Sequence, residues 1–204
     1  SVVGYWKLDG GAEGAFGSAD GGTAFDGTGH EDLVGTEDLN PSLVTVMAWV
    51  RFAELPPADT TDWDPYIAGK TGDAGTESWV LSLGGAGGAA ESTIYFSARG
   101  TGFSGANSGP HDTVLSPGQW VHVAGVFDGD ALSLYLDGRL VATASVPFDA
   151  IASNPRPIRI GNSHLAPNTI DNHLKGIVDD LIVLSRPLSP TEVTAYYNSH
   201  QPYA

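Results

Sequence analysis

The sequence contains no cysteine and few basic residues. Without cysteine, its 204 residues form no disulfide bond and supply no thiol for catalysis. Exported domains of this size often manage without disulfides, so this absence does not exclude export. Nine Lys and Arg against 24 Asp and Glu give a formal charge of −15. This charge disfavours nucleic acids, anionic membranes and highly sulfated or uronic polymers as partners, because they require basic patches.

Long apolar runs are also missing. None approaches the roughly 20 residues that a membrane-spanning helix needs, so we expect no insertion into a membrane. The first residues already have the pattern of a strand, and we expect no signal peptide among them. We interpret residues 1–204 as one domain, excised from a larger exported protein. We therefore expect it outside the cell or on the cell surface, beside the neighbouring domains of that chain.

Glycine and proline are plentiful, at 27 and 13 residues, as many short strands joined by turns require. The clearest strands lie in Gln119–Ala142. Trp120–Phe127 is largely apolar on both alternating faces, which is typical of a strand covered on both sides. Leu132, Leu134 and Leu136 alternate with other residues, and turns rich in Asp and Gly flank this second strand. The stretch predicts three antiparallel strands, which must bury a face against another sheet.

Two further runs predict long strands, and one segment predicts a helix. Leu43–Phe52 is the most hydrophobic run and indicates a central strand, while Gly176–Leu184 indicates a closing strand. Ser189-Pro190-Thr191-Glu192 has the pattern of a capping box, with serine as the cap and proline at the first helical position. We expect the helix Pro190–Asn198 to be the only one.

Several short motifs follow one another along the chain. The central stretch contains Trp-x-His-Val-Ala, then Phe-Asp-Gly, then Leu-x-Leu-Tyr-x-Asp-Gly and Val-Ala. The other motifs are Gly4–Asp9, Phe25–Gly27, Val46–Val50, Ile158–Gly161, Gly176–Asp180 and Arg186–Ser189. Together they resemble the LamG-like (laminin G-like, or concanavalin A-like lectin/glucanase) domains of bacterial or archaeal type. The resemblance covers nearly the whole chain and implies an all-β, two-sheet antiparallel jelly-roll sandwich with one short C-terminal helix.

Carboxylates at two places suggest a calcium site. The loop Asp26–Asp32 supplies carboxylates and glycine carbonyls at close spacing, and Ca²⁺ takes six to eight oxygen ligands. Strand alternation predicts that Asp179 and Asp180 point to opposite faces, and an inward carboxylate is costly unless it is paired or bound to metal.

Similar jelly rolls bind Ca²⁺ where the first strands meet the last. The resemblance therefore implies a structural Ca²⁺ held by Asp179 and the Asp26-Gly27 turn, with Asp9 or Asp32 as a further ligand. The alternative is that these are turn residues and a salt-bridged aspartate. The acidity itself has two explanations, namely solubility in a salty or extracellular setting and local cation sites. The spacing of an EF-hand is absent.

Aromatic and planar polar residues in or beside loops suggest a sugar-binding platform. Aromatic faces stack on the C–H faces of sugars, whereas their hydroxyls need hydrogen-bonding partners. The predicted ligand-binding residues are Trp63, Tyr66, Trp79, Arg99, His164 and His173.

Each of these residues also has a structural interpretation. Trp63 lies between two aspartates and is either exposed to ligand or a loop anchor. Trp79 opens a strand and is otherwise a core residue, and the histidines are otherwise hydrogen-bonding loop residues. Trp6, Trp49 and Trp120 lie inside strand patterns and are predicted to be core.

Catalytic motifs are not found. The paired carboxylates of jelly-roll glycosidases, which would alternate along one strand, are missing, as are G-x-S-x-G, H-E-x-x-H and a phosphate loop. We therefore predict no catalytic residues and a non-catalytic carbohydrate-binding or adhesion module whose partner is a glycan or an extracellular protein. The alternatives are a protein-interaction or spacer domain, and a glycoside hydrolase or polysaccharide lyase with an unrecognised site, because one fold hosts many functions.

Overall fold

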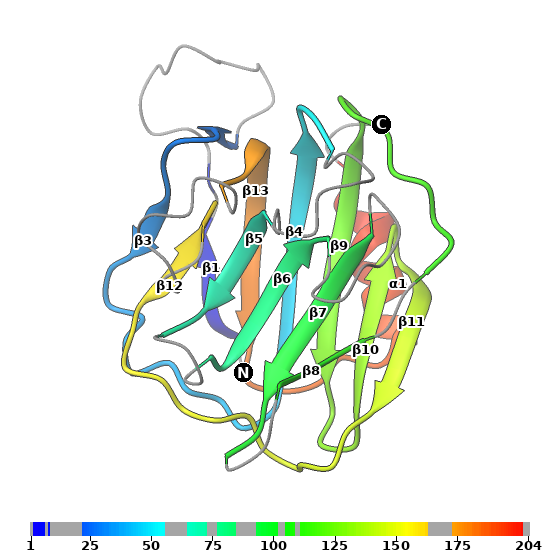
Figure 1. Cartoon of the computed structure of the whole chain (residues 1–204). Helices are drawn as coiled ribbons and strands as arrows, with labels where there is room; N and C mark the ends of the chain where they lie inside the picture. The colour runs from blue at the N-terminus through cyan, green and yellow to red at the C-terminus, as the bar shows by residue number, and fades with distance from the viewer. Residues whose placement is uncertain are drawn as a thin grey trace.

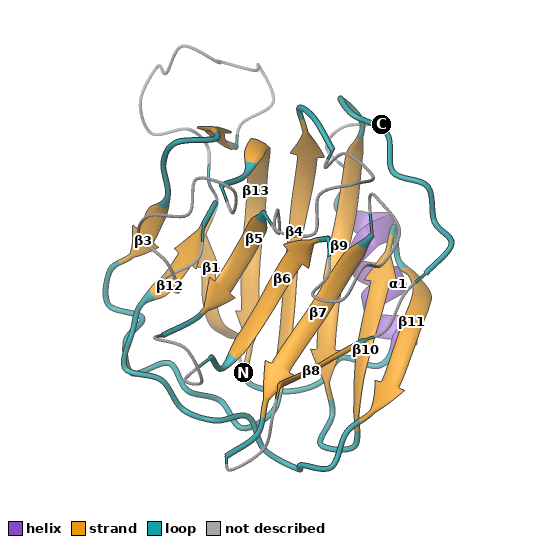
Figure 2. Cartoon of the chain, viewed as in Figure 1, coloured by secondary structure: helices purple, strands orange, loops and turns teal. Residues whose placement is uncertain are grey.

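The chain forms two antiparallel β-sheets packed face to face, with one helix on the outside (Figures 1 and 2). The computed structural model describes residues 2–6, 8, 22–55, 65–72, 77–84, 93–101, 105–108, 111–162 and 173–201. The described part contains no helix with the length and hydrophobicity that crossing a membrane requires. The predicted two-sheet jelly-roll sandwich with a short C-terminal helix is confirmed.

Sheet A lies behind in Figure 1 and contains the strands of the central stretch. Its order is β1 (Val2–Trp6), β13 (Lys175–Leu184), β4 (Val44–Phe52), β9 (Trp120–Phe127), β10 (Ala131–Leu136) and β11 (Arg139–Ser145). A further strand, β2 (Thr23–Asp26), also pairs with β13. β1 and β2 therefore share one edge of β13, each pairing with a different half of it.

Sheet B lies in front and is built from shorter strands. Its order is β3 (Glu31–Leu33), β12 (Ile158–Ile160), β5 (Tyr66–Lys70), β6 (Trp79–Leu83), β7 (Ile94–Arg99) and β8 (Gly105–Asn107).

The hydrophobic core fills the space between the sheets and follows the alternation of side chains along the strands. Val46 and Val50 of β4 point into it and are fully buried, as is Phe96 from the facing β7. Gly125 of β9 lies directly over Phe96, and a Cβ at position 125 would overlap the phenyl ring. Glycine is therefore needed where these two strands approach each other.

The three-stranded stretch predicted from sequence is confirmed as β9, β10 and β11. The carboxylate of Asp128 accepts hydrogen bonds from the backbone N–H groups of Asp130 and Ala131, which closes the first turn. In the second turn Asp137 has a positive φ of 48°, and its side chain accepts the backbone N–H of His122.

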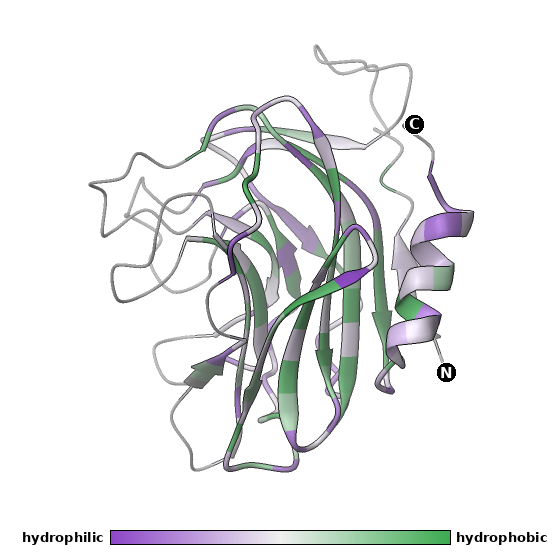
Figure 3. Ribbon diagram, turned by 90° about the vertical axis from the view of Figure 1, so that its right-hand side faces the viewer, coloured by the Kyte–Doolittle hydropathy of each residue, from purple (hydrophilic) through white to green (hydrophobic). Residues whose placement is uncertain are grey.

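A second, smaller core lies on the outer face of sheet A beneath the helix α1 (Pro190–Ser199) (Figure 3). The predicted capping box is present: the Ser189 side chain accepts the Glu192 N–H at 3.3 Å, and the Glu192 side chain accepts the Ser189 N–H at 2.8 Å. Val193 then packs on Met47 and other outward residues of the sheet. Trp49 is buried as predicted, but against His122 and Tyr197 rather than between the sheets.

Lys70 occupies an inward position at the end of β5 and is completely buried. Its Nζ donates hydrogen bonds to the carbonyl oxygens of Thr36, Glu37 and Arg156 at 2.8, 3.0 and 2.7 Å. Because an ammonium group has three donors, all are satisfied. The side chain thereby joins the segment that follows β3 to the segment that precedes β12, a role that sequence reasoning missed.

Candidate functional site

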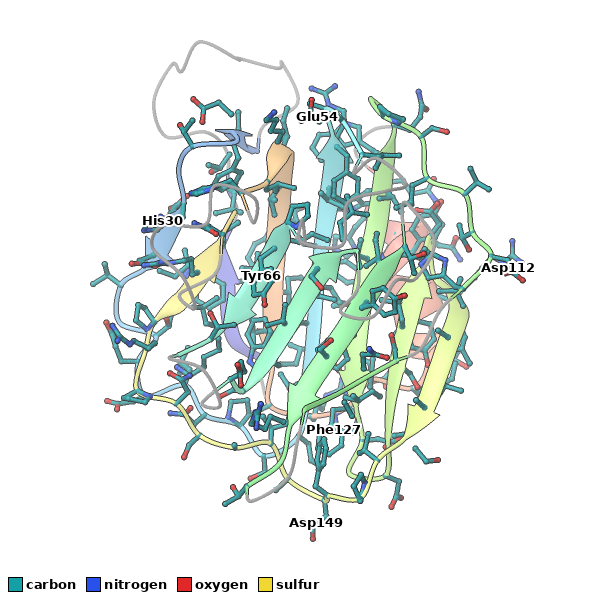
Figure 4. All side chains as sticks on the ribbon, in the orientation of Figure 1. His30, Glu54, Tyr66, Asp112, Phe127 and Asp149 are labelled. Carbon is teal, nitrogen blue, oxygen red and sulfur yellow. The ribbon has the colours of Figure 1, made fainter. Side chains whose placement is uncertain are left out.

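Tyr66 and Arg99, two of the predicted sugar-binding residues, lie on the outer face of sheet B. Tyr66 is half-buried on β5 (Figure 4). Arg99 is half-buried on β7, a strand of the same sheet (Figure 1). Trp79 points the opposite way, into the core, where 1% of its surface is exposed. Its assignment as a ligand residue is therefore wrong, because a fully buried indole ring offers no face to a sugar. The alternative interpretation, a core tryptophan, holds.

The centre of this outer face is not open. Tyr66, Ser82 and Tyr95 are in register across three strands and point away from the core. Ser82 and Tyr95 are nevertheless only 8% and 4% exposed. The buried residues Ser82 and Tyr95 therefore lie between Tyr66 and Arg99. Arg99 also forms an ion pair with Glu77 at 2.8 Å.

The remaining predicted sugar-binding residues do not gather with these two. His173 is half-buried and its Nε2 lies 2.8 Å from the side-chain amide of Asn162. Trp63 and His164 lie outside the described residues. The described part of the chain thus brings Tyr66 and Arg99 to one face without forming a common pocket.

The predicted calcium ligands Asp26 and Gly27 have other partners. The Asp26 carboxylate accepts hydrogen bonds from the N–H and the hydroxyl of Thr28, at 2.9 and 2.6 Å. These bonds, chiefly that from the hydroxyl, lower the pKa of Asp26 and keep it ionised. Gly27 has a positive φ of 87°, and the side chain of Lys175 packs where its Cβ would be. The aliphatic part of Lys175 therefore covers this turn, while its ammonium group pairs with Glu54.

Asp32 belongs to the other sheet. It lies on β3 and is in register with Arg159 of β12. The guanidinium of Arg159 donates to both carboxylate oxygens of Asp32, at 2.6 and 2.9 Å. A fork-shaped pair of this kind satisfies the carboxylate. The alternative interpretation of a salt-bridged aspartate therefore applies to Asp32.

Asp179 and Asp180 lie in the gap between the part of β13 that pairs with β1 and the part that pairs with β2. The expected alternation fails here because of a β-bulge: Val178 and Leu181 both point into the core. Asp180 has a positive φ of 48°, and its N–H donates to the carboxylate of Asp179 at 2.7 Å. Asp179 is only 3% exposed.

The predicted metal ligands therefore do not form one site. Asp26 is opposite Lys175 in the register of β2 and β13. Lys175 is four residues from Asp179 on β13, or about 13 Å along an extended strand. Within the described ranges, no three His, Asp or Glu side chains lie close enough to hold a metal ion. Asp9 lies outside the described residues. A calcium ion beside Asp179 stays a prediction, without Asp26, Gly27 or Asp32 as ligands.

A cavity of about 410 Å³ lies at one end of sheet A, where β2, β13 and β4 run side by side. We call it the β2–β13–β4 cavity. Its described lining consists of Ala24, Phe25, Asp26, Arg51, Phe52, Ala53, Gly118, Lys175, Gly176 and Ile177. Ala24, Ala53 and Gly118 are exposed, so the cavity opens to solvent. Its apolar surface is interrupted by one carboxylate and two cationic groups.

The order of these residues follows from strand register. Ala24, Ile177, Arg51 and Trp120 form one row across β2, β13, β4 and β9. They point outward, because their strand neighbours Val50, Val121 and Val178 point into the core. The guanidinium carbon of Arg51 lies 5.3 Å from the centre of the Trp120 ring, in a cation–π contact.

The two cationic groups of the cavity differ in their partners. Lys175 donates to the carboxylate of Glu54 at 2.6 Å, and Glu54 lies just beyond the end of β4 (Figure 4). The side chain of Arg51 makes no hydrogen bond or ion pair with the described part of the chain, and its guanidinium lies against Trp120. A half-buried guanidinium with unused donors therefore faces the cavity.

Sequence reasoning missed Arg51 and Lys175, and it assigned Trp120 to the core. The signal that could have found them is the position of Arg51 and Trp120 on outward-pointing sites of adjacent predicted strands. Reading that signal requires the lateral register of two strands that are almost 70 positions apart in the chain. Alternation within one strand does not reveal it.

Comparison with known proteins gives the family. A family model for the concanavalin A-like lectin/glucanases superfamily matches residues 25–194. The chain belongs to this superfamily. The LamG-like resemblance seen in its motifs is thus confirmed. Among functionally curated proteins, none matches the sequence.

Several solved structures share the fold of this concanavalin A-like domain. Domain 4 of AbnA, a GH43 extracellular arabinanase from Geobacillus stearothermophilus, matches with a TM-score of 0.60 and 20% identity, over 90% of this chain and 78% of that one. A SAP-like pentraxin from Limulus polyphemus gives 0.64 and 18%, over 85% and 80%. A protein from Bacteroides ovatus gives 0.60 and 19%, over 84% of this chain and 45% of that chain.

Proposed function

We propose that this domain is a non-catalytic carbohydrate-binding module of a larger exported protein, and that sugar binds in the β2–β13–β4 cavity. The observation that carries the proposal is the cavity's combination of an apolar surface with ionic groups at its rim. Its volume of about 410 Å³ falls within the range usual for small-ligand sites. Ala24 and Ala53 offer exposed apolar surface to the C–H face of a sugar, and Asp26 and Arg51 offer an acceptor and donors to its hydroxyl groups.

The similar structures support a sugar as the ligand. The arabinanase domain was solved in complex with arabinotriose, and the Bacteroides protein is described as one proposed to bind carbohydrate. At 20% identity or less these proteins share the fold with this chain, and their ligands guide the choice of probes. The arabinanase is an extracellular enzyme, which agrees with our proposal that this domain is exported.

The described lining of the cavity also supports a role in binding rather than hydrolysis. Glycoside hydrolysis commonly uses two carboxylic groups placed on either side of the scissile bond. The described lining contains a single carboxylate, Asp26, and hydrogen bonds from Thr28 lower its pKa. An acid that must donate a proton near neutral pH needs a raised pKa instead.

The proposal is tested by a binding screen combined with a variant that blocks the cavity. Ala24→Leu adds bulk at an exposed lining position, and Ala195→Leu adds the same bulk to an exposed position of α1 as the matched control. We expect one or more neutral or acidic oligosaccharides to raise the melting temperature of the wild type by mass action. Ala24→Leu should abolish this shift and Ala195→Leu should keep it.

Two results would count against the proposal. If no saccharide raises the melting temperature, a protein-interaction or spacer role becomes the better explanation, and the search turns to extracellular proteins. If a saccharide binds equally to the wild type and to Ala24→Leu, the module binds sugar elsewhere. In that case the outer face of sheet B, with Tyr66 and Arg99, is the next region to test by Tyr66→Ala.

A further inference from the structure

The β2–β13–β4 cavity contains a cationic group, Arg51, whose charge a neutral sugar would leave unpaired. In a chain with 24 acidic and nine basic residues, most cationic side chains would be expected to find a carboxylate. Arg99, Arg159, Lys175 and Arg186 do so. Among the described residues Arg51 finds none, although it is half-buried and lines the cavity.

Leaving a half-buried guanidinium without an anion costs free energy, because part of its hydration is lost. The ring of Trp120 compensates in part and also holds the guanidinium in place, since a cation is attracted to the face of an indole. A guanidinium has five donors in a rigid planar fork, and this arrangement matches the two oxygens of a carboxylate. Lys175 lies on the same lining, but its ammonium group is already paired with Glu54.

We infer that the cavity binds an acidic sugar, with the carboxylate on Arg51, the hydroxyl groups on Asp26 and the C–H face on the exposed apolar surface of Ala24 and Ala53. This inference rests on the proposed function and assigns its ligand class. The net charge of −15 sets a further limit: it repels a polymer with an acid on every unit. The ligand is therefore an isolated or terminal acidic unit on an otherwise neutral glycan.

The test compares pairs of sugars that differ in one group. Titration calorimetry measures the binding of methyl galacturonoside and methyl galactoside, and of methyl glucuronoside and methyl glucoside, to the wild-type domain. We expect an acidic member to bind roughly tenfold to a hundredfold more tightly than its neutral counterpart, the usual range for a hydrogen-bonded charged group. Galactose 6-sulfate is a third probe, because its oxygens are not planar.

Arg51→Gln removes the charge but keeps a planar polar group at the cavity. Arg139→Gln removes the same charge from an exposed position on β11 and is the matched control. We expect Arg51→Gln to lose the preference for the acid while retaining the weaker binding of the neutral sugar. Arg139→Gln should retain both, and urea unfolding curves of both variants should match the wild type.

The possible failures are distinguishable. Equal binding of acidic and neutral sugars by the wild type overturns the acidic-ligand inference and leaves the proposed function standing. A preference for the acid that survives in Arg51→Gln overturns the role given to Arg51. Tighter binding of the 6-sulfate than of the galacturonoside overturns the assignment of a carboxylate. Absence of binding by every sugar overturns both the inference and the proposed function.

Discussion

His122 should make the stability of this protein sensitive to mild acid. Its ring lies beneath α1, with ring centres 5.3 Å from Trp49, 5.5 Å from Tyr196 and 5.9 Å from Tyr197. Its side chain is fully buried, and neither ring nitrogen has a hydrogen-bond partner among the residues that the structure describes. Burial, with a smaller effect of His200, lowers the pKa of His122 to about 4. A proton on this ring would therefore be a buried charge without an anion.

The size of the effect follows from the two pKa values. The unfolded chain takes up this proton near pH 6.5, whereas folded His122 takes it up only near pH 4. Between these values the unfolded state binds more protons, so the free energy of unfolding falls as the pH falls through this window. At about 1.4 kcal/mol per pH unit the loss is about 3 kcal/mol. For a domain of this length it corresponds to a fall of roughly 6–12 °C in melting temperature.

The assay is urea unfolding at several pH values between 7 and 4, for the wild type and for His122→Phe. Phenylalanine keeps a ring beneath α1 but binds no proton, and carboxylates affect both proteins alike, so the difference between the curves isolates His122. We expect the variant to gain about 2–3 kcal/mol relative to the wild type between pH 7 and pH 4.5. His200→Gln, an exposed neighbour, should follow the wild type. Parallel pH profiles for the wild type and His122→Phe would refute the reasoning.

Three further predictions concern structural residues. Lys70→Met should lower the free energy of unfolding by about 3–5 kcal/mol, because three buried carbonyl oxygens lose their donor. An equal loss of stability in the exposed control Arg139→Met would contradict the role given to these hydrogen bonds. Gly125→Ala should cost about 1–3 kcal/mol in urea unfolding, because its Cβ meets the Phe96 ring, and an unchanged midpoint would show that the sheets can separate at little cost. If Ca²⁺ binds beside Asp179, the wild type should melt at a higher temperature in millimolar Ca²⁺ than in EDTA. The exposed control Asp149→Asn should show the same increase, and Asp179→Asn should show none. Equal melting temperatures of the wild type in both buffers would show that no stabilising calcium ion binds.

The fold was accessible from sequence because its determinants are local. Alternation along the chain placed the leucines of β10 inward, and turn residues such as Asp128 and Asp137 marked where its neighbours begin. Ser189 and Glu192 marked the start of α1 to the residue, and only its last position differed, at Ser199 instead of Asn198. Each of these signals lies within a few residues of the feature that it predicts.

The candidate site was not accessible in the same way. The family resemblance predicted that the calcium ligands lie close together. Strand register instead places Asp26 beside Lys175 and Asp32 beside Arg159. Asp179 lies at a bulge four residues along β13 from Lys175. Alternation also failed at this bulge, since one extra residue shifts every later side chain to the other face. The predicted sugar-binding residues were likewise divided, with Trp79 in the core and Tyr66 on the opposite face of sheet B.

The sequence by itself therefore determined the class of fold, most of the strands, and the helix α1 with its cap, since backbone conformation and side-chain alternation depend on near neighbours. Only the tertiary structure decided which charges meet. Arg51, Trp120 and Lys175 lie on three strands whose pairing is set by the packing of the whole sheet. Contacts between strands depend on register across the sheet, and register is a property of the assembled core rather than of any one stretch of chain.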